Sequence, residues 1–381
     1  QKRGNDMAKM QLTLYAACKD GNDVLTALHN VFQKEIKEVK EENKNISFLL
    51  HTQTKIDMEV CDDEEMVRQQ MEGMSNFFAN VPCENKMLLK KLCIQISLFH
   101  CIFAIVIDTA KEERTHVLKM IFEAAKACHG FLLYPDMCLY TADGDLLMGM
   151  DGTSGVEDFS LCGEEDALQQ VSLPSAYDME VFVSIGKEFE RQGWLYPNCM
   201  LNKQILFSQI HLPKKEDIGK RALALYALAW FSKLCLEDDK EQRQQFEEFK
   251  QRFSLEHCLT SQEASLLKKD TLDKQQAVEL LSKFECANML FWSLGYDGGS
   301  SWDVCDVEKM KEWIMQYASF EDFLNHCAIK DEKDIYTQYV RVFYAEHFYM
   351  QSAMLYVPLS LQEDVVSERL RACKWLCDGC E

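Results

Sequence analysis

The stretch CIFAIVID, at residues 101–108, is the clearest signal for a buried strand in the chain. A short apolar run that is rich in β-branched residues is typical of a strand buried between other elements. A helical pattern follows over residues 112–128, and Gly130 is expected to end that helix. The strand and the helix together indicate that the N-terminal part of the chain mixes both kinds of element.

The same alternation extends outward in both directions from this strand. Upstream, strand character is expected over 11–18 and 46–60, and helices are expected from Asp23, from Asp62 or Asp63, and near Glu84. The charged run KEIKEVKEENK at 34–44 is expected to be the solvated end of the Asp23 helix. Downstream, strand pieces are expected over 131–133, 137–140 and 146–148. The sequence therefore predicts an α+β fold whose first domain, residues 7–150, is a ferredoxin-like α/β sandwich.

The rest of the chain changes character twice. Residues 151–174 combine glycines, one proline and acids with little periodicity, which favours a linker. Residues 175–381 lose the strand signal and are expected to form an irregular all-α domain. Its helices are predicted over 181–192, 221–236, 272–294, 307–317, 333–352 and 363–376. Asp306 is expected to cap the helix that begins near Val307.

The charge balance excludes some classes of partner. The chain has 41 Lys and Arg residues against 62 Asp and Glu residues, so its formal net charge is −21. Such an excess of acids argues against nucleic acid, because affinity for nucleic acid comes mostly from neutralising phosphates. It also argues against an anionic membrane surface, and the longest apolar run, 92–107, is too short to span a bilayer. A basic protein partner remains compatible with this charge.

The cysteines indicate the compartment. There are 17 of them, scattered through apolar stretches of a long chain. Unpaired thiols of this kind fit a reducing environment, so a cytoplasmic location is expected. Cys373, Cys377 and Cys380 are close enough in sequence to suggest a zinc site, but three thiols also fall on one apolar helix face. The apolar face is the favoured interpretation, and no metal or cofactor is expected.

A few charged residues interrupt the apolar helices of the second half. Arg221, Glu285, Glu368 and Arg369 are such residues, and a buried charge needs a partner. Glu285 is expected to pair with Arg221 or with Arg369. Together with Trp292, these residues form either a structural network or a pocket that recognises a ligand.

The second half also resembles a known family. The segments that carry the resemblance are EDIGKRALALYALAWF (216–231), LTSQEASLL (259–267), FECANMLFWSLGY (284–296), CDV (305–307) and VVSERLRACKWL (365–376). In this order and spacing they resemble the bacterial family called domain of unknown function 4272, over residues 175–377. The positions that match the family pattern are Arg221, Glu263, Glu285, Trp292, Leu294, Gly295, Cys305, Asp306, Glu368, Arg369, Ala372 and Trp375. The resemblance implies an α-helical domain in a bacterial cytoplasmic protein. It brings no established activity, and thus no catalytic residues.

Two functional hypotheses remain open at this point. The chain lacks the serine-elbow, zinc-protease and nucleotide-loop signatures, which favours a non-catalytic protein-interaction module, such as an immunity or antagonist protein. The alternative is an enzyme or a small-molecule sensor with a pocket around Glu285, Trp292 and Arg369 in the helical domain. The sequence indicates no oligomeric state.

Overall fold

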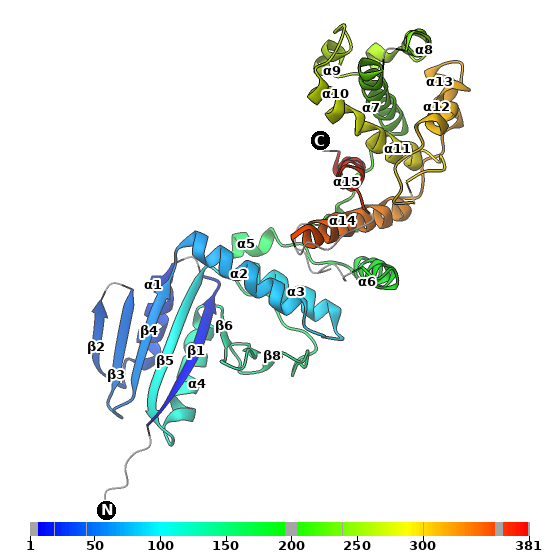
Figure 1. The fold of residues 1–381 in the computed structure, drawn as a ribbon. Helices are drawn as coiled ribbons and strands as arrows, with labels where there is room; N and C mark the ends of the chain where they lie inside the picture. The colour runs from blue at the N-terminus through cyan, green and yellow to red at the C-terminus, as the bar shows by residue number, and fades with distance from the viewer. Residues whose placement is uncertain are drawn as a thin grey trace, which may run out of the picture. The chain divides into compact units, whose positions relative to one another are not determined.

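The computed structural model describes residues 7–18, 20–42, 44–194, 204–237, 239–299, 301–354 and 361–379. The chain divides into two compact units, the first ending at Leu173 and the second beginning at Pro174. The first unit holds the described strands together with several helices, and the second is helical (Figure 1). The prediction of an α+β domain followed by an all-α domain is confirmed.

The elements of the first unit follow one another in a mixed order. Its strands are β1 (Met7–Ala16), β2 (Ile36–Glu42), β3 (Asn45–Leu50), β4 (Lys55–Cys61), β5 (Cys101–Ala110), β6 (Gly130–Leu133), β7 (Leu139–Tyr140) and β8 (Leu146–Met148). Its helices are α1 (Gly21–Phe32), α2 (Glu64–Ala79), α3 (Lys86–Ser97), α4 (Arg114–Ala127) and α5 (Glu165–Gln169).

The strands form one antiparallel sheet in the order β2-β3-β4-β5-β1-β6-β7-β8. The CIFAIVID run lies in β5, which pairs with β1 on one side and β4 on the other. Helix α1 lies between β1 and β4 in the chain, and α4 connects β5 to β6. In the sheet, β5 lies between β1 and β4, and β1 lies between β5 and β6. Each β-α-β unit therefore encloses a strand of the other unit. Interleaved split units of this kind make the ferredoxin-like arrangement.

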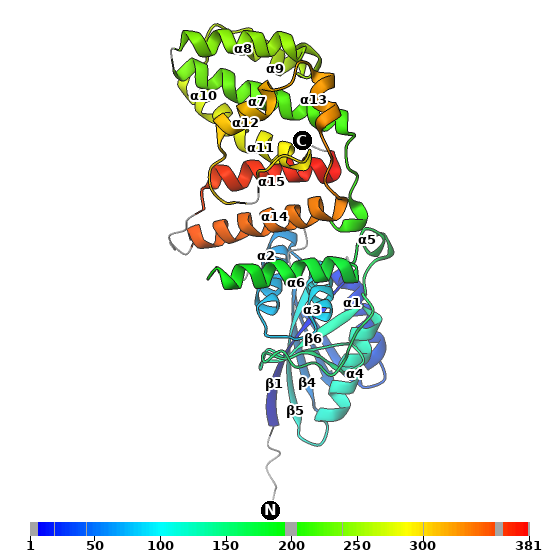
Figure 2. The same cartoon turned by 90° about the vertical axis from the view of Figure 1, so that its right-hand side faces the viewer.

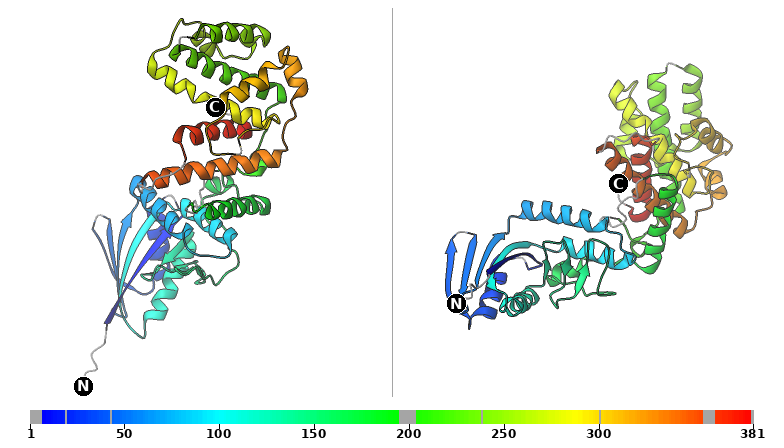
Figure 3. Two further views of the ribbon diagram at one scale, coloured as in Figure 1. Left: turned by 45° about the vertical axis from the view of Figure 1, so that its right-hand side comes forward. Right: turned by 60° about the horizontal axis from the view of Figure 1, so that its bottom comes forward.

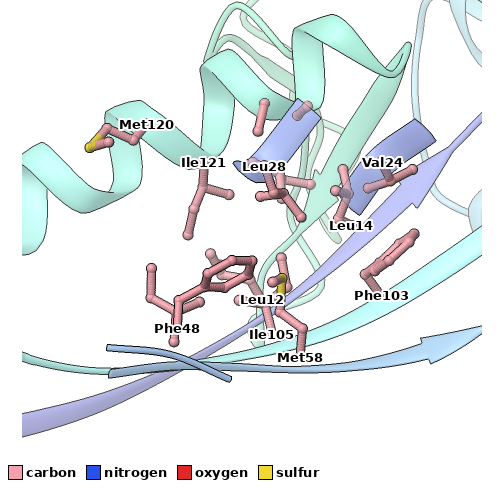
Figure 4. Packing of buried hydrophobic residues seen from close by; sticks show 14 of the residues in the cluster. Leu12, Leu14, Val24, Leu28, Phe48, Met58, Phe103, Ile105, Met120 and Ile121 are labelled. Atoms are coloured by element: carbon pink, nitrogen blue, oxygen red, sulfur yellow. The ribbon is translucent and has the colours of Figure 1, made fainter. Parts of the chain in front are cut away.

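The core of the first unit lies between the sheet and the pair α1 and α4 (Figure 4). Because side chains alternate along a strand, every second residue of the central strands points into this core. The labelled members are Leu12, Leu14, Val24, Leu28, Phe48, Met58, Phe103, Ile105, Met120 and Ile121. Helices α2 and α3 lie on the opposite side of the sheet (Figure 3), where Gln70 of α2 donates a hydrogen bond to the Tyr15 hydroxyl.

Two sequence expectations for the first unit differ from the structure. The charged run at 34–44 does not extend α1, which ends at Phe32, because residues 36–42 pair with β3 as strand β2. This strand is at the edge of the sheet and is largely exposed. An edge strand tolerates charged side chains, which also hinder pairing with other chains.

The second difference concerns the expected linker at 151–174. Residues up to Leu173 belong to the first unit. The Gln95 side chain of α3 holds Cys162 through two hydrogen bonds of 2.8 and 2.9 Å to its backbone. Asn85 likewise donates to the Glu157 carbonyl at 2.9 Å. The segment packs in this way because its irregular backbone finds partners in the side chains of α3.

The second unit is a set of helices. They are α6 (Ala176–Arg191), α7 (Lys215–Leu236), α8 (Lys240–Arg252), α9 (Ser261–Leu266), α10 (Lys274–Leu281), α11 (Lys283–Ser293), α12 (Val307–Met315), α13 (Phe320–His326), α14 (Glu332–Met354) and α15 (Glu363–Asp378). Two short 3-10 turns are η1 (Phe207–Gln209) and η2 (Leu255–His257). Helices α6, α14, α15, α11, α7 and α8 pack in succession (Figure 2).

Most of the predicted helices are present, with one division. The pattern over 272–294 becomes two helices, α10 and α11, which meet at Ser282. The Ser282 hydroxyl bonds back to the Glu279 carbonyl at 2.8 Å, a local bond that competes with the helical ladder. Asp306 caps α12 by accepting from the Lys309 N–H, as expected. Among the described helices, none has both the length and the apolar character needed to cross a membrane.

Candidate functional site

Two of the sequence-predicted residues form a sealed ion pair. Glu285 on α11 accepts from Arg369 on α15, with 2.9 Å from Nε and 2.8 Å from Nη2 to Oε2. The side chains of Arg369 and Glu285 are only 2% and 5% exposed. Of the two partners considered for Glu285, the structure selects Arg369 rather than Arg221.

The same pair anchors the loop that precedes α12. Arg369 also donates to the carbonyl oxygens of Ser301 and Asp303. The second carboxylate oxygen of Glu285 accepts from the Cys305 N–H at 2.6 Å. Buried charges that are paired and fully hydrogen-bonded in this way fix local structure. At Glu285 and Arg369 the protein's own loop occupies the polar groups, which corresponds to the structural network of the two alternatives rather than to the pocket.

Trp292 does not share in these hydrogen bonds. It lies further along α11 and is partly buried, and the Lys330 ammonium lies 5.2 Å from the centre of its ring. A cation over an indole face stabilises the local packing. Trp292 does not line the cavity described next.

A cavity of about 180 Å³ opens where α7, α11 and α15 meet. Its lining residues are Arg221, Leu225, Lys283, Cys286, Leu290, Arg371, Ala372 and Trp375. Leu225, Leu290 and Ala372 are buried and form an apolar floor. Arg221, Lys283 and Arg371 bring three positive charges to the same space, one from each of the three helices.

Two carboxylates hold these cations in place. Arg221 Nη1 lies 2.6 Å from Glu263 Oε1, and Glu263 also accepts from the Thr260 N–H in the capping box of α9. Lys283 Nζ lies 2.9 Å from both oxygens of Glu368, which accepts from Arg371 as well. The described ion pairs thus bring three cations and two carboxylates to one place, in a chain whose formal net charge is −21.

A larger groove of about 590 Å³ adjoins this cavity and shares Lys283 and Arg371 with it. It runs between α10 and α15. Its other lining residues are Leu266, Gln276, Val278, Glu279, Leu280, Ser282, Asp364 and Glu368. The groove is thus mixed in character, with apolar, amide, hydroxyl and acidic side chains.

Two of the three terminal cysteines lie on the buried face of α15. Cys373 and Cys377 are fully buried on α15 and are free thiols, while Cys380 lies outside the described residues. Burial, the largest cause, raises the pKa of the Cys377 thiol to about 12. The thiol therefore stays protonated at neutral pH, whereas zinc binds the deprotonated thiolate. Within the described ranges, no three His, Cys, Asp or Glu side chains are grouped to hold a metal ion.

Comparison with known proteins assigns the family. Residues 189–381 match the family described as Domain of unknown function (DUF4272). The chain belongs to this family. No curated protein matches the chain, and no solved structure does. The DUF4272 match contains both the sealed pair and the cationic cavity, together with every residue that lines the adjoining groove.

The sequence indicates only part of this DUF4272 site, which comprises the cavity and the carboxylates that hold its cations. Arg221 and Glu368 are recognised as charges in apolar helices, but Lys283 and Arg371 are not. One signal was available, because Glu368 and Arg371 are three residues apart and thus neighbours on one helix face. Lys283 carries no such signal, since its partner Glu368 lies on a different helix.

Proposed function

We propose that the DUF4272 domain of this chain binds a small organic anion. The charged group of the ligand binds Arg221, Lys283 and Arg371, and its apolar part lies on the floor of the cavity. One observation carries the proposal: three cations from three helices converge over buried apolar side chains. A cavity that has cationic side chains beside an apolar floor suits a ligand that carries both a negative charge and an apolar part.

The cations are suited to a second anion besides the carboxylates that hold them. A guanidinium has five N–H donors in a rigid fork, so Arg371 can bond Glu368 through Nη1 and still donate elsewhere. The ion pairs also fix the positions of these side chains before a ligand arrives, which lowers the entropy lost on binding. Three cations that line one cavity attract an anion, although the net charge of the chain is negative.

The size and chemistry of the cavity favour binding of a short ligand over nucleophilic catalysis. A volume of about 180 Å³ is below the roughly 300–1,000 Å³ of pockets for drug-sized molecules. Cys286 lines the cavity, but burial raises its pKa to about 12, so it is a thiol at neutral pH rather than a nucleophilic thiolate.

Calorimetric titration with acetate, caproate, phenylacetate and inorganic phosphate tests the proposal. We expect caproate or phenylacetate to bind more tightly than acetate, because only the longer anions reach the apolar floor. Arg371→Gln should weaken this binding about tenfold or more, as loss of a charge-assisted hydrogen bond does. Lys374→Gln is the matched control, since Lys374 is exposed on α15 but does not line the cavity.

Two results would overturn this proposal. One is the absence of binding by all four anions. The other is equal binding by the wild-type protein and Arg371→Gln.

A second candidate function, binding of a basic protein, is supported by a different surface. Residues 62–65 at the start of α2 are four consecutive acids, and all are exposed. Titration with poly-lysine in rising salt tests this surface, because screening weakens exposed charge pairs. Replacing Glu64 and Glu65 by Gln should lower the affinity, and an unchanged affinity would contradict the candidate.

A further inference from the structure

The cationic cavity is continuous with a second space along the same pair of helices. Lys283 and Arg371 line both the cavity and the adjoining groove. Helices α11 and α15 run in the same direction here, since Lys283 pairs with Glu368 and Glu285 pairs with Arg369 (Figure 2). A ligand that is held by these two cations therefore meets the cavity on one side and the groove on the other.

The two spaces differ in size and lining. The cavity, at about 180 Å³, equals roughly six times the ~30 Å³ share of a water molecule in the liquid, which is space for a single residue. The groove is about three times larger, at about 590 Å³. Its apolar lining includes Val278, a residue that is 54% exposed, and its amide and hydroxyl groups come from Gln276 and Ser282.

We propose that the anion is the C-terminal carboxylate of a polypeptide. This inference rests on the proposed function and specifies its ligand. The carboxylate binds Arg221, Lys283 and Arg371, the last side chain is apolar and occupies the cavity, and the preceding residues lie in the groove. Capture of a chain terminus by positioned donors is a recurring mode of peptide recognition.

The groove fits an extended chain better than a compact molecule. A peptide offers apolar side chains as well as backbone N–H and C=O groups, and the groove offers partners for each. Gln276 and Ser282 can bond the peptide backbone, and Leu266, Val278 and Leu280 can contact its side chains.

The acidic side chains of the groove indicate which residues would precede the C-terminal residue of the bound peptide. Glu279 and Asp364 are exposed and line the groove, which Arg221 does not. Asp364 and Arg371 are seven residues apart on α15, which is about 10 Å at 1.5 Å per residue. Carboxylates at that distance repel acidic residues upstream of the terminus and favour lysine or arginine there.

The test uses one hexapeptide that ends in leucine and carries two lysines upstream. It is made with a free C-terminal carboxylate and as the C-terminal amide. Titration into the full-length protein should give at least tenfold tighter binding for the free acid, because the amide removes the charge. N-acetylleucine should bind more weakly than the hexapeptide acid, since it reaches the cavity but not the groove.

Variants separate the groove from the cavity. Val278→Ser removes an apolar contact without adding charge, so it should weaken the hexapeptide acid severalfold and leave N-acetylleucine unchanged. Val304→Ser is the matched control, because Val304 is 56% exposed and lies outside the groove. Both positions are exposed, so both variants should fold.

The outcomes distinguish this inference from the proposed function. Equal binding of acid and amide overturns capture of the C-terminus, and so does N-acetylleucine binding as tight as the hexapeptide acid. In either case, binding of caproate or phenylacetate that depends on Arg371 leaves the proposed function standing. If neither the peptides nor the small anions bind, both proposals fail.

Discussion

Arg369 and Glu285 form an ion pair that is almost completely removed from solvent, with 2.8 Å between Nη2 and Oε2. The pair joins α15 to α11 and fixes the backbone of residues 301–305. Breaking a buried pair by removing one partner leaves an uncompensated charge, and this usually costs more than the pair itself contributes. The pair is therefore the point at which the helical unit is most sensitive to a single substitution.

Arg369→Met should lower the free energy of unfolding by about 3–5 kcal/mol, because it leaves the Glu285 carboxylate buried without its partner. Urea denaturation measures this loss. Arg371→Met provides the comparison, since that guanidinium is 53% exposed and its ion pair should contribute no more than about 1 kcal/mol. Equal losses in the two variants would contradict the structural role assigned to Arg369.

Asp178 should make the stability of the helical unit depend on pH. Burial acts to raise the pKa of this carboxyl, but hydrogen bonds from the Phe207 and Ser175 N–H groups and from the Ser175 and Tyr336 hydroxyls outweigh it, so the pKa is lowered. A lowered pKa in the folded state stabilises it above the unfolded value of about 3.9 and loses that effect as pH falls further.

Asp178→Asn should destabilise the protein at pH 7, and the difference from wild type should shrink as pH falls below about 4. Urea unfolding at a series of pH values measures it. A difference that stays constant between pH 7 and pH 3 would show that the charge of Asp178 is not responsible.

Gly152 should be intolerant of a side chain for two separate reasons. Its φ is +82°, and a Cβ atom would lie 2.5 Å from the Pro82 carbonyl oxygen. Gly144 is the matched control, with φ of +89° and no atom within 4 Å of the added Cβ. Gly144→Ala should cost about 1–2 kcal/mol for the left-handed backbone alone.

Gly152→Ala should cost clearly more than Gly144→Ala, because the contact with Pro82 adds to the backbone strain. Thermal unfolding of the two variants measures the difference. Equal melting temperatures would mean that the segment around Gly152 does not pack against Pro82 in solution.

Cys286 should be protected from alkylation in the native protein. With its pKa raised to about 12 by burial, only about one thiol in 10⁴ is ionised at pH 8, whereas a free cysteine with a pKa of about 8.5 is substantially ionised. Iodoacetamide labelling followed by mass spectrometry should therefore show modification at least 100-fold slower in the native protein than in urea. Similar rates in both conditions would indicate that the cavity between α7, α11 and α15 opens readily.

Local sequence patterns determined much of the fold. The run 101–108 predicted the central strand β5, because a short apolar segment rich in β-branched residues is typical of a strand inside a sheet. The periodicity of residues 363–376 predicted α15, and Asp306 predicted the start of α12. The charges Glu285 and Arg369 were identified because each interrupts an apolar helix face.

The tertiary structure decided the features that depend on contacts between distant segments. Residues 36–42 form a strand because β3 offers hydrogen-bond partners, which outweighs their charged composition. Glu285 pairs with Arg369 rather than Arg221, because Glu263 holds Arg221 while Arg369 is also held by the carbonyl groups of Ser301 and Asp303. The cationic cavity could not be found from spacing, since Arg221, Lys283 and Arg371 come from three helices whose meeting is fixed only when their apolar faces pack together.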